Sequence, residues 1–187
     1  MAIRSLKNGT FSRSLLVGNA FFDPTDYESI ATTSLSTTTA TITFSSIPST
    51  YTHLQLRGIA RTNRGNSIDS LELRINGNSP TKYHELRGNG STASGSSGNV
   101  ANGIIPGGNA GSNVFGVFVA DILDYNDANK NKTIRTLCGY DDNGSGEINS
   151  TSSFNNSTSA VTSLTIAVGT GNSFVQYSRF ALYGMKG

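Results

Sequence analysis

The segment FSSIPSTYTHLQLRGIAR, residues 44–61, decides the fold class of this chain. In its second half Leu54 and Leu56 alternate with polar side chains, which is the period of a half-buried β-strand. The turn at Ile47-Pro48 separates this strand from a preceding alternating run, TATITFS. The segment therefore predicts two strands joined by a short turn.

The same alternation recurs along the chain. In DSLELRIN, Leu71, Leu73 and Ile75 alternate with polar side chains such as Glu72, which we expect to face outward, and Asn76-Gly77 predicts a hairpin. We count nine or ten strands and no convincing helix. The other expected strands are YESIATT from residue 27, a returning strand near 81–87, 114–123, 133–140, a weak edge strand at 148–154, and a final hairpin formed by 160–169 and 173–186.

The run VFGVFVADIL, residues 114–123, differs from the others because it is apolar on both faces. A strand of this kind is covered on both sides. We expect the second cover to be the long loop or a neighbouring subunit.

Strands at this spacing predict an all-β protein, an antiparallel β-sandwich of jelly-roll type. Such a sandwich needs only one apolar face per sheet, which suits a chain of 187 residues with 35% hydrophobic content. We expect an N-terminal extended arm at 1–26 and a head at 27–187. The head contains a long Gly/Ser/Asn-rich loop at 88–113, with one anchored point at Ile104-Ile105-Pro106.

Composition narrows the function. A net charge of +2 argues against a general nucleic-acid binder. No window has the roughly 18 apolar residues of a membrane span, and the N-terminus lacks the apolar core of a secretory signal. We therefore expect no nucleic-acid or membrane partner and synthesis in the cytoplasm.

The arm is basic and apolar, with no acid before Asp23. Exposed apolar side chains commonly mark contact sites, so we predict that the arm binds a neighbouring subunit or partner. The alternative is a floppy terminus. The predicted partner-binding residues are Ile3, Arg4, Leu6, Phe11, Leu15, Leu16, Phe21 and Phe22.

Reactive side chains are few, and we predict no catalytic residue and no cofactor. His53 and His84 fall on outward positions of neighbouring expected strands, but two histidines without a third ligand are a weak metal signal. The segment DDNGSGE, 141–147, matches half of a calcium loop, although a hairpin turn explains it as well. Cys138 lies in an alternating run, which favours a buried apolar role.

One turn offers a ligand-binding hypothesis. Tyr125 lies between Asp124 and Asn126, an aromatic face flanked by hydrogen-bonding groups, as a sugar ring requires. The alternative is that Tyr125 packs on its own hairpin. We expect any contact with a recognised ligand to lie here and in the long loop rather than in the strands.

Four segments resemble a group of small virion structural or tail-fibre-like proteins encoded by marine and cyanobacterial tailed phages. They are MAIRSLKNGTFSRSLLVGN, YESIATTSLSTTTATITFSSIPSTYTHLQLRGIAR, ADILDYNDANKNKTIRTLCGYDDNGSGEIN and YSRFALYGMKG. The resemblance implies a non-enzymatic component of the virion exterior, either a short tail-fibre head or a capsid decoration. It implies other virion proteins as partners and a homo-oligomer, with a trimer the expected state. The alternatives are a lectin-like module that recognises host surface glycans and, third, a glycan hydrolase.

Overall fold

A computed structural model of the protein describes residues 27–169 and 171–186. The described residues form strands, turns and bends without a helix, which confirms the all-β prediction. It follows that no described helix has the length and apolar character needed to cross a membrane.

The strands form two sheets in which all neighbouring strands are antiparallel. The described residues contain twelve strands, two more than the upper count from sequence. They are β1 (Tyr27–Ser34), β2 (Thr41–Phe44), β3 (His53–Ala60), β4 (Ile68–Ile75), β5 (Lys82–Gly88), β6 (Ala93–Gly98), β7 (Gly103–Pro106), β8 (Gly116–Ile122), β9 (Lys132–Asp141), β10 (Gly146–Asn155), β11 (Leu164–Val168) and β12 (Arg179–Met185).

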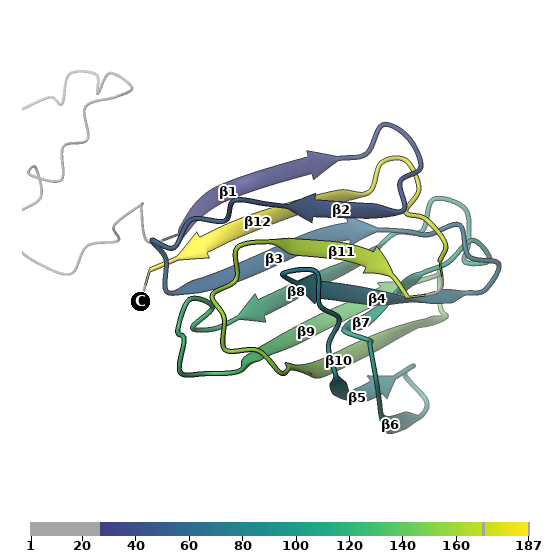
Figure 1. Cartoon of the computed structure of the whole chain (residues 1–187). Coiled ribbons are helices and arrows are strands. Elements are labelled where there is room, and N and C mark those ends of the chain that lie inside the picture. Colours follow the sequence, from purple (N-terminus) through teal and green to yellow (C-terminus); the bar gives the residue numbers. More distant parts are fainter. Residues whose placement is uncertain (1–26, 170, 187) are drawn as a thin grey trace, which may run out of the picture.

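The large sheet has eight strands in the order β1-β12-β3-β8-β9-β10-β5-β6, and the small sheet has four in the order β2-β11-β4-β7. From β1 to β5 the chain changes sheet at every step, and it changes again before β7, β8, β11 and β12. Figure 1 shows the two sheets stacked as layers, with β5 and β6 at one end. The architecture is therefore an open two-layer arrangement, consistent with a β-sandwich.

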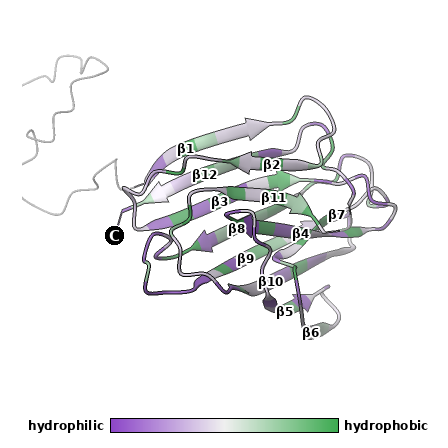
Figure 2. Cartoon of the chain, in the orientation of Figure 1, coloured by the Kyte–Doolittle hydropathy of each residue, from purple (hydrophilic) through white to green (hydrophobic). Residues whose placement is uncertain are grey.

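The core fills the space between the layers. Leu54 and Leu56 from β3 and Leu71 and Leu73 from β4 have no exposed surface, as their alternation predicts. Apolar and polar residues mix along most strands in Figure 2, because each strand gives one side chain in two to the core. Burial of this inward set is the main stabilising contribution.

Three predictions of strand pairing are wrong. The turn at Asn76-Gly77 forms, with φ of 50° and 80°, but the chain then crosses to the large sheet, so β4 pairs with β11 and β7 rather than with β5. The last two strands do not form a hairpin, because β11 lies in the small sheet and β12 in the large one.

The segment predicted as an edge strand, β10, is hydrogen-bonded along both of its edges, to β9 and to β5. Turn chemistry fixes the bend, while the destination of the chain depends on which apolar faces meet.

The prediction of a long loop at 88–113 is also wrong, because the segment contains β6 and β7. The anchored point is confirmed: Ile104 and Ile105 are buried, and β7 pairs with β4. After β7, the Arg61 guanidinium donates hydrogen bonds to the carbonyls of Gly108, Ala110, Gly111 and Val114. The composition of β6, Ala-Ser-Gly-Ser-Ser-Gly, obscured the strand pattern, since glycine is depleted in strands and no large apolar residue alternates along it.

Candidate interaction surface

The outer face of the large sheet is the side of the layer turned away from the small sheet. Antiparallel register aligns its outward side chains in rows across the strands. One row carries Arg57, Val119, Leu137, Ser150 and Leu86 on consecutive strands from β3 to β5. The adjacent row carries Ile59, Val117, Gly139, Ile148 and Gly88.

These two rows bring together six aliphatic side chains, which we call the outer patch. Its members are Ile59 (41% exposed), Leu86 (70%), Val117 (58%), Val119 (36%), Leu137 (60%) and Ile148 (64%). Contiguous apolar surface of this kind is unusual on a monomeric soluble protein, and such surfaces commonly belong to contact sites. The apolar second face predicted for 114–123 is thus present, and no described part of the chain covers it.

The outer patch is hollowed at one end. A groove of about 710 Å³ is lined by patch residues together with the turns 88–90 and 141–146. Gly139 lies opposite Ile148, and a Cβ atom at Gly139 would come within 3.3 Å of the Ile148 side chain. The absence of a side chain at Gly139 therefore helps keep the groove open.

The next row across the sheet is polar and consists of Gln55, Asp121, Arg135, Ser152 and His84. Asp121 accepts a hydrogen bond from Gln55 Nε2 at 2.8 Å and forms an ion pair with Arg135 at 3.2 Å. This polar row borders the outer patch on one side.

A pair of tyrosines extends this surface onto β1 and β12. Tyr27 and Tyr183 stack with ring centroids 4.9 Å apart, and the Arg57 guanidinium lies over both rings. The Tyr27 hydroxyl donates to Gln55 Oε1 at 2.6 Å. Burial is the main cause that raises the pKa of Tyr27 above its ordinary value. The start of β1 is thus fixed onto the outer face.

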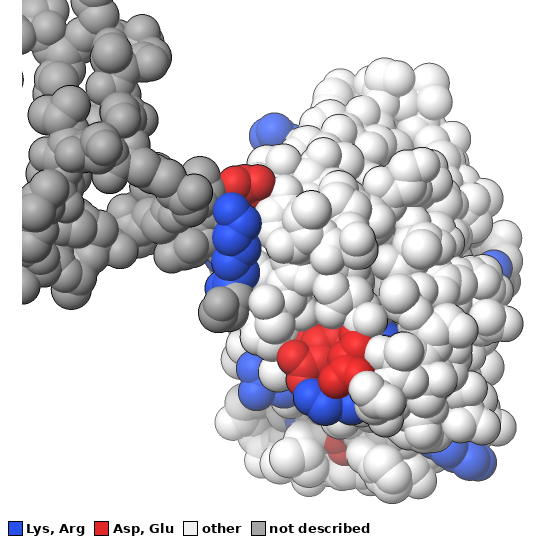
Figure 3. Space-filling model, turned by 60° about the vertical axis from the view of Figure 1, so that its left-hand side comes forward, with Lys and Arg blue, Asp and Glu red and all other residues white. Residues whose placement is uncertain are grey.

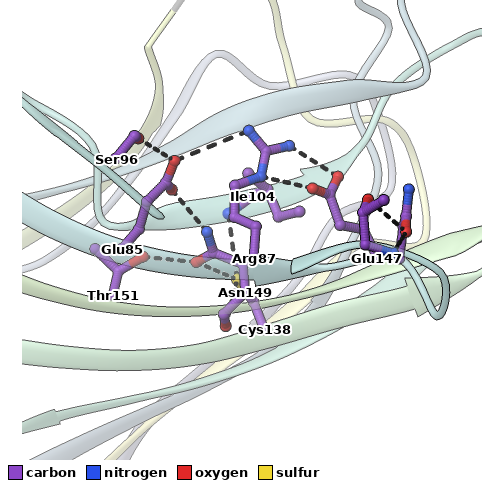
Figure 4. Close-up of polar contacts among 10 residues, drawn as sticks. Glu85, Arg87, Ser96, Ile104, Cys138, Glu147, Asn149 and Thr151 are labelled. Atoms are coloured by element: carbon purple, nitrogen blue, oxygen red, sulfur yellow. Dashed lines mark hydrogen bonds and ion pairs between the residues drawn. The ribbon is translucent and has the colours of Figure 1, made fainter. Parts of the chain in front are cut away.

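A polar network lies beneath the outer patch, on the inward side of β5, β9 and β10 (Figure 4). Arg87 donates to both Glu147 oxygens, at 2.6 and 2.8 Å, in a bidentate pair that raises the pKa of Arg87. Glu85 accepts from Ser96 and from Asn149, each at 2.7 Å. Both carboxylates are engaged by structural partners, so the network holds β5, β6 and β10 together.

Cys138 belongs to the same network. The Ile104 amide donates to its sulfur at 3.2 Å, and the thiol lies 3.5 Å from Asn149 Oδ1. Burial raises the pKa of the thiol to about 11. Because the thiolate is the nucleophilic form, this cysteine is an inert core residue, as predicted.

The sugar-binding hypothesis at Tyr125 is wrong in its geometry. The Tyr125 ring is 1% exposed, and its hydroxyl donates to the Pro48 carbonyl. Asn126 Nδ2 donates to the carbonyls of Ser49 and Tyr51, and Asp124 pairs with Lys130 at 2.6 Å, which lowers the pKa of Asp124. The alternative is correct in that Tyr125 is buried, but the contacts of Tyr125 and Asn126 join the turn to residues 48–51 rather than to its own hairpin.

The first residue of β9, directly after this turn, is a buried lysine. Lys132 is 1% exposed, and its ammonium donates to the carbonyls of Asp127, Lys130 and Thr158. Burial lowers its pKa, while the three carbonyls satisfy its donors. This segment supports the fold and does not present an adaptable binding loop.

The two candidate metal sites from the sequence, the histidine pair and the segment 141–147, do not bring a set of metal ligands together. His53 in β3 and His84 in β5 are separated by β8, β9 and β10, so the expectation that their strands are neighbours is wrong. The segment 141–147 forms the β9–β10 hairpin turn, where Asp141 accepts from the Gly144 amide and Asp142 from the Gly111 amide. Within 27–169 and 171–186, no three His, Cys, Asp or Glu side chains gather as metal ligands.

Charged side chains are sparse on the face shown in Figure 3, where the negative groups lie beside positive ones and a few other positive groups stand apart. Pairs such as Lys130–Asp124 and Lys186–Glu28 are of this mixed kind. Opposite charges that lie this close largely cancel at a distance, so these pairs contribute little to the long-range electrostatic attraction of a partner.

The eight predicted arm residues lie outside the described residues. The outer patch was not predicted as a site, although one signal was present: apolar residues occupy both parities in 114–123, and Leu137 and Ile148 are outward. Joining them into one patch requires the register between strands, which a single sequence does not give.

Comparisons with known proteins identify no relative: no family, no curated protein and no solved structure matches the chain. Function therefore has to be inferred from the chain's own surface.

Proposed function

We propose that this protein is a non-enzymatic structural component of a tailed-phage virion, on the particle exterior, as a short tail-fibre head or a capsid decoration. The observation that carries the proposal is the outer patch, which fits a subunit made to be covered in an assembly. The four sequence segments that resemble phage virion proteins point the same way. On this view the partners are other virion proteins and further copies of the chain, in a homo-oligomer that we expect to be a trimer.

We also infer a jelly-roll topology. The order β2-β11-β4-β7 in the small sheet and β1-β12-β3-β8 in the large sheet supports it, because consecutive strands of these two four-stranded units alternate between them along the chain, except from β4 to β7. The strands β9, β10, β5 and β6 then extend the large sheet beyond β8. Jelly rolls are used in viral capsid proteins and in lectins.

The test is the number of copies in purified particles of the phage that encodes the chain, measured by quantitative mass spectrometry against a major capsid peptide. A fibre head predicts a few copies per tail and a decoration predicts copies on the scale of the capsid lattice. Absence of the protein from purified particles would overturn the proposal.

A carbohydrate-binding module is the second candidate. The Tyr27–Tyr183 pair supports it, since partly exposed rings beside Gln55 and Asp121 offer stacking and hydrogen bonding. Titration of host surface polysaccharide by calorimetry should then give a heat signal that Tyr183→Ala removes. An unchanged signal in that variant would exclude this site.

A further inference from the structure

We propose that the outer patch is the docking site for the chain's own N-terminal segment, residues 1–26, from the same or a neighbouring copy. This goes beyond the virion role, which leaves open what covers the patch, and it does not depend on that role.

The position where the described chain begins supports the proposal. Tyr27 lies on the outer face, bonded to Gln55 and covered by Arg57, and Val119 of the outer patch is the cross-strand partner of Arg57. Val119 lies three strand spacings from β1, about 14 Å across the sheet, and its row is four residues, about 13 Å, along β3 from His53, which shares the row of Tyr27. The 26 preceding residues can span at most roughly 85–95 Å, so they are long enough to reach the patch of their own copy or that of an adjacent one.

Composition supports the same occupant. Residues 1–26 contain Ile3, Leu6, Phe11, Leu15 and Leu16 among their apolar side chains. Such side chains and the aliphatic outer patch gain by leaving water together. The other large apolar side chains exposed in the described part of the chain are spread over four segments, at Val100, Leu123, Phe154 and Tyr177.

The shape and charge of the groove favour an extended chain segment as its occupant over the flat sheet of a second copy. The groove is concave, with glycines in its floor and two turns as walls, and a groove of this size accepts several bulky side chains. Asp141 is exposed at the groove. The arm carries Arg4, Lys7 and Arg13 with no acid before Asp23, so its charge is complementary.

The experiment is site-specific photo-crosslinking in the full chain. A benzophenone amino acid replaces Ile148 in the outer patch, and in a matched control it replaces Phe154, which is on the same face of the same strand across the polar row. After irradiation and digestion, we expect peptides from residues 1–26 attached at position 148 and not at 154. Mixing copies labelled with nitrogen-14 and nitrogen-15 shows whether the captured segment comes from the same chain.

A second variant tests the chemistry. Leu137→Glu should reduce the crosslink at position 148 by about tenfold or more, since docking would bury an unpaired carboxylate. Unchanged circular dichroism and a still unreactive Cys138 thiol would verify that this variant is folded. Capture of strand peptides from a second copy would mean that two sheets pack face to face. That result, or capture of no segment of the chain, would overturn the proposal.

Discussion

Leucine in this protein occupies two opposite environments on the strands of a single domain. Leu73 in β4 is fully buried between the sheets, whereas Leu137 in β9 is 60% exposed on the outer patch. The two positions therefore separate the core contribution of a leucine from its contribution to a surface contact.

We expect Leu73→Ala to lower the free energy of unfolding by about 2–5 kcal/mol, because it leaves a cavity in the core. Leu137→Ala, the matched control, should change it by about 0.5 kcal/mol or less in dilute protein. Urea denaturation of both variants measures the difference. Equal losses would show that the outward register of β9 is incorrect.

Glu72 shows where alternation was a poor guide to exposure. It takes an outward position on β4, as predicted, yet its side chain is only 2% exposed because Arg74 and Ser79 bind its two oxygens. Burial raises the pKa of this carboxyl, but the hydrogen bonds from Arg74 and Ser79 outweigh burial, and the net pKa is lowered.

A lowered pKa in the folded state means that the unfolded chain takes up the proton first as pH falls. The stabilisation from Glu72 should be fully present above the ordinary glutamate pKa of about 4.3 and lost as pH falls through the lower folded value. Urea midpoints measured from pH 7 to pH 3 should therefore fall less steeply in Glu72→Gln than in the unchanged protein. A steeper fall in the variant would contradict the direction of the shift.

At the scale of elements, local pattern predicted most strands but not their partners. The inward leucines of β3 and β4 could be identified because a period of two fixes the side of each residue within a strand. The pairing of β4 with β11, about 90 residues later, has no signal in the sequence of either strand. The same limit applies to the outer patch, which combines residues from five strands.

The segment 107–115 shows a further limit of prediction from sequence, because a side chain that is distant in the sequence holds it in place. Arg61 directs its guanidinium at four carbonyls there, and Asp142 binds the Gly111 amide. A glycine-rich stretch that reads as a free loop is thus fixed by contacts from β3's end and from the β9–β10 turn.

Arg61→Lys should speed hydrogen exchange in 107–115, since one ammonium cannot replace a planar five-donor group. Exchange in β9 and β10 should stay unchanged. Arg179→Lys, at an exposed position of β12, is the matched control and should leave both regions as they are. Equal protection of 107–115 in all three proteins would mean that Arg61 does not hold this segment.

At the scale of the whole molecule, the protein has a closed apolar core between its sheets and an open apolar face outside them. The side chains of the core are buried within a single copy of the chain. The open apolar face is the observation on which our proposal of a larger assembly rests.

The strand order also determines when the protein can fold during its synthesis. β3 lies between β12 and β8, and β2 and β11 pair through residues as far apart as Thr43 and Thr165. A ribosome working at about 5–20 residues per second completes β3 many seconds before it makes β12. We expect stalled chains that end at residue 173 to be digested by protease, and full-length chains to resist it. The large sheet thus cannot be completed before β12 is made, and until then the unpaired early strands have to be kept from aggregating.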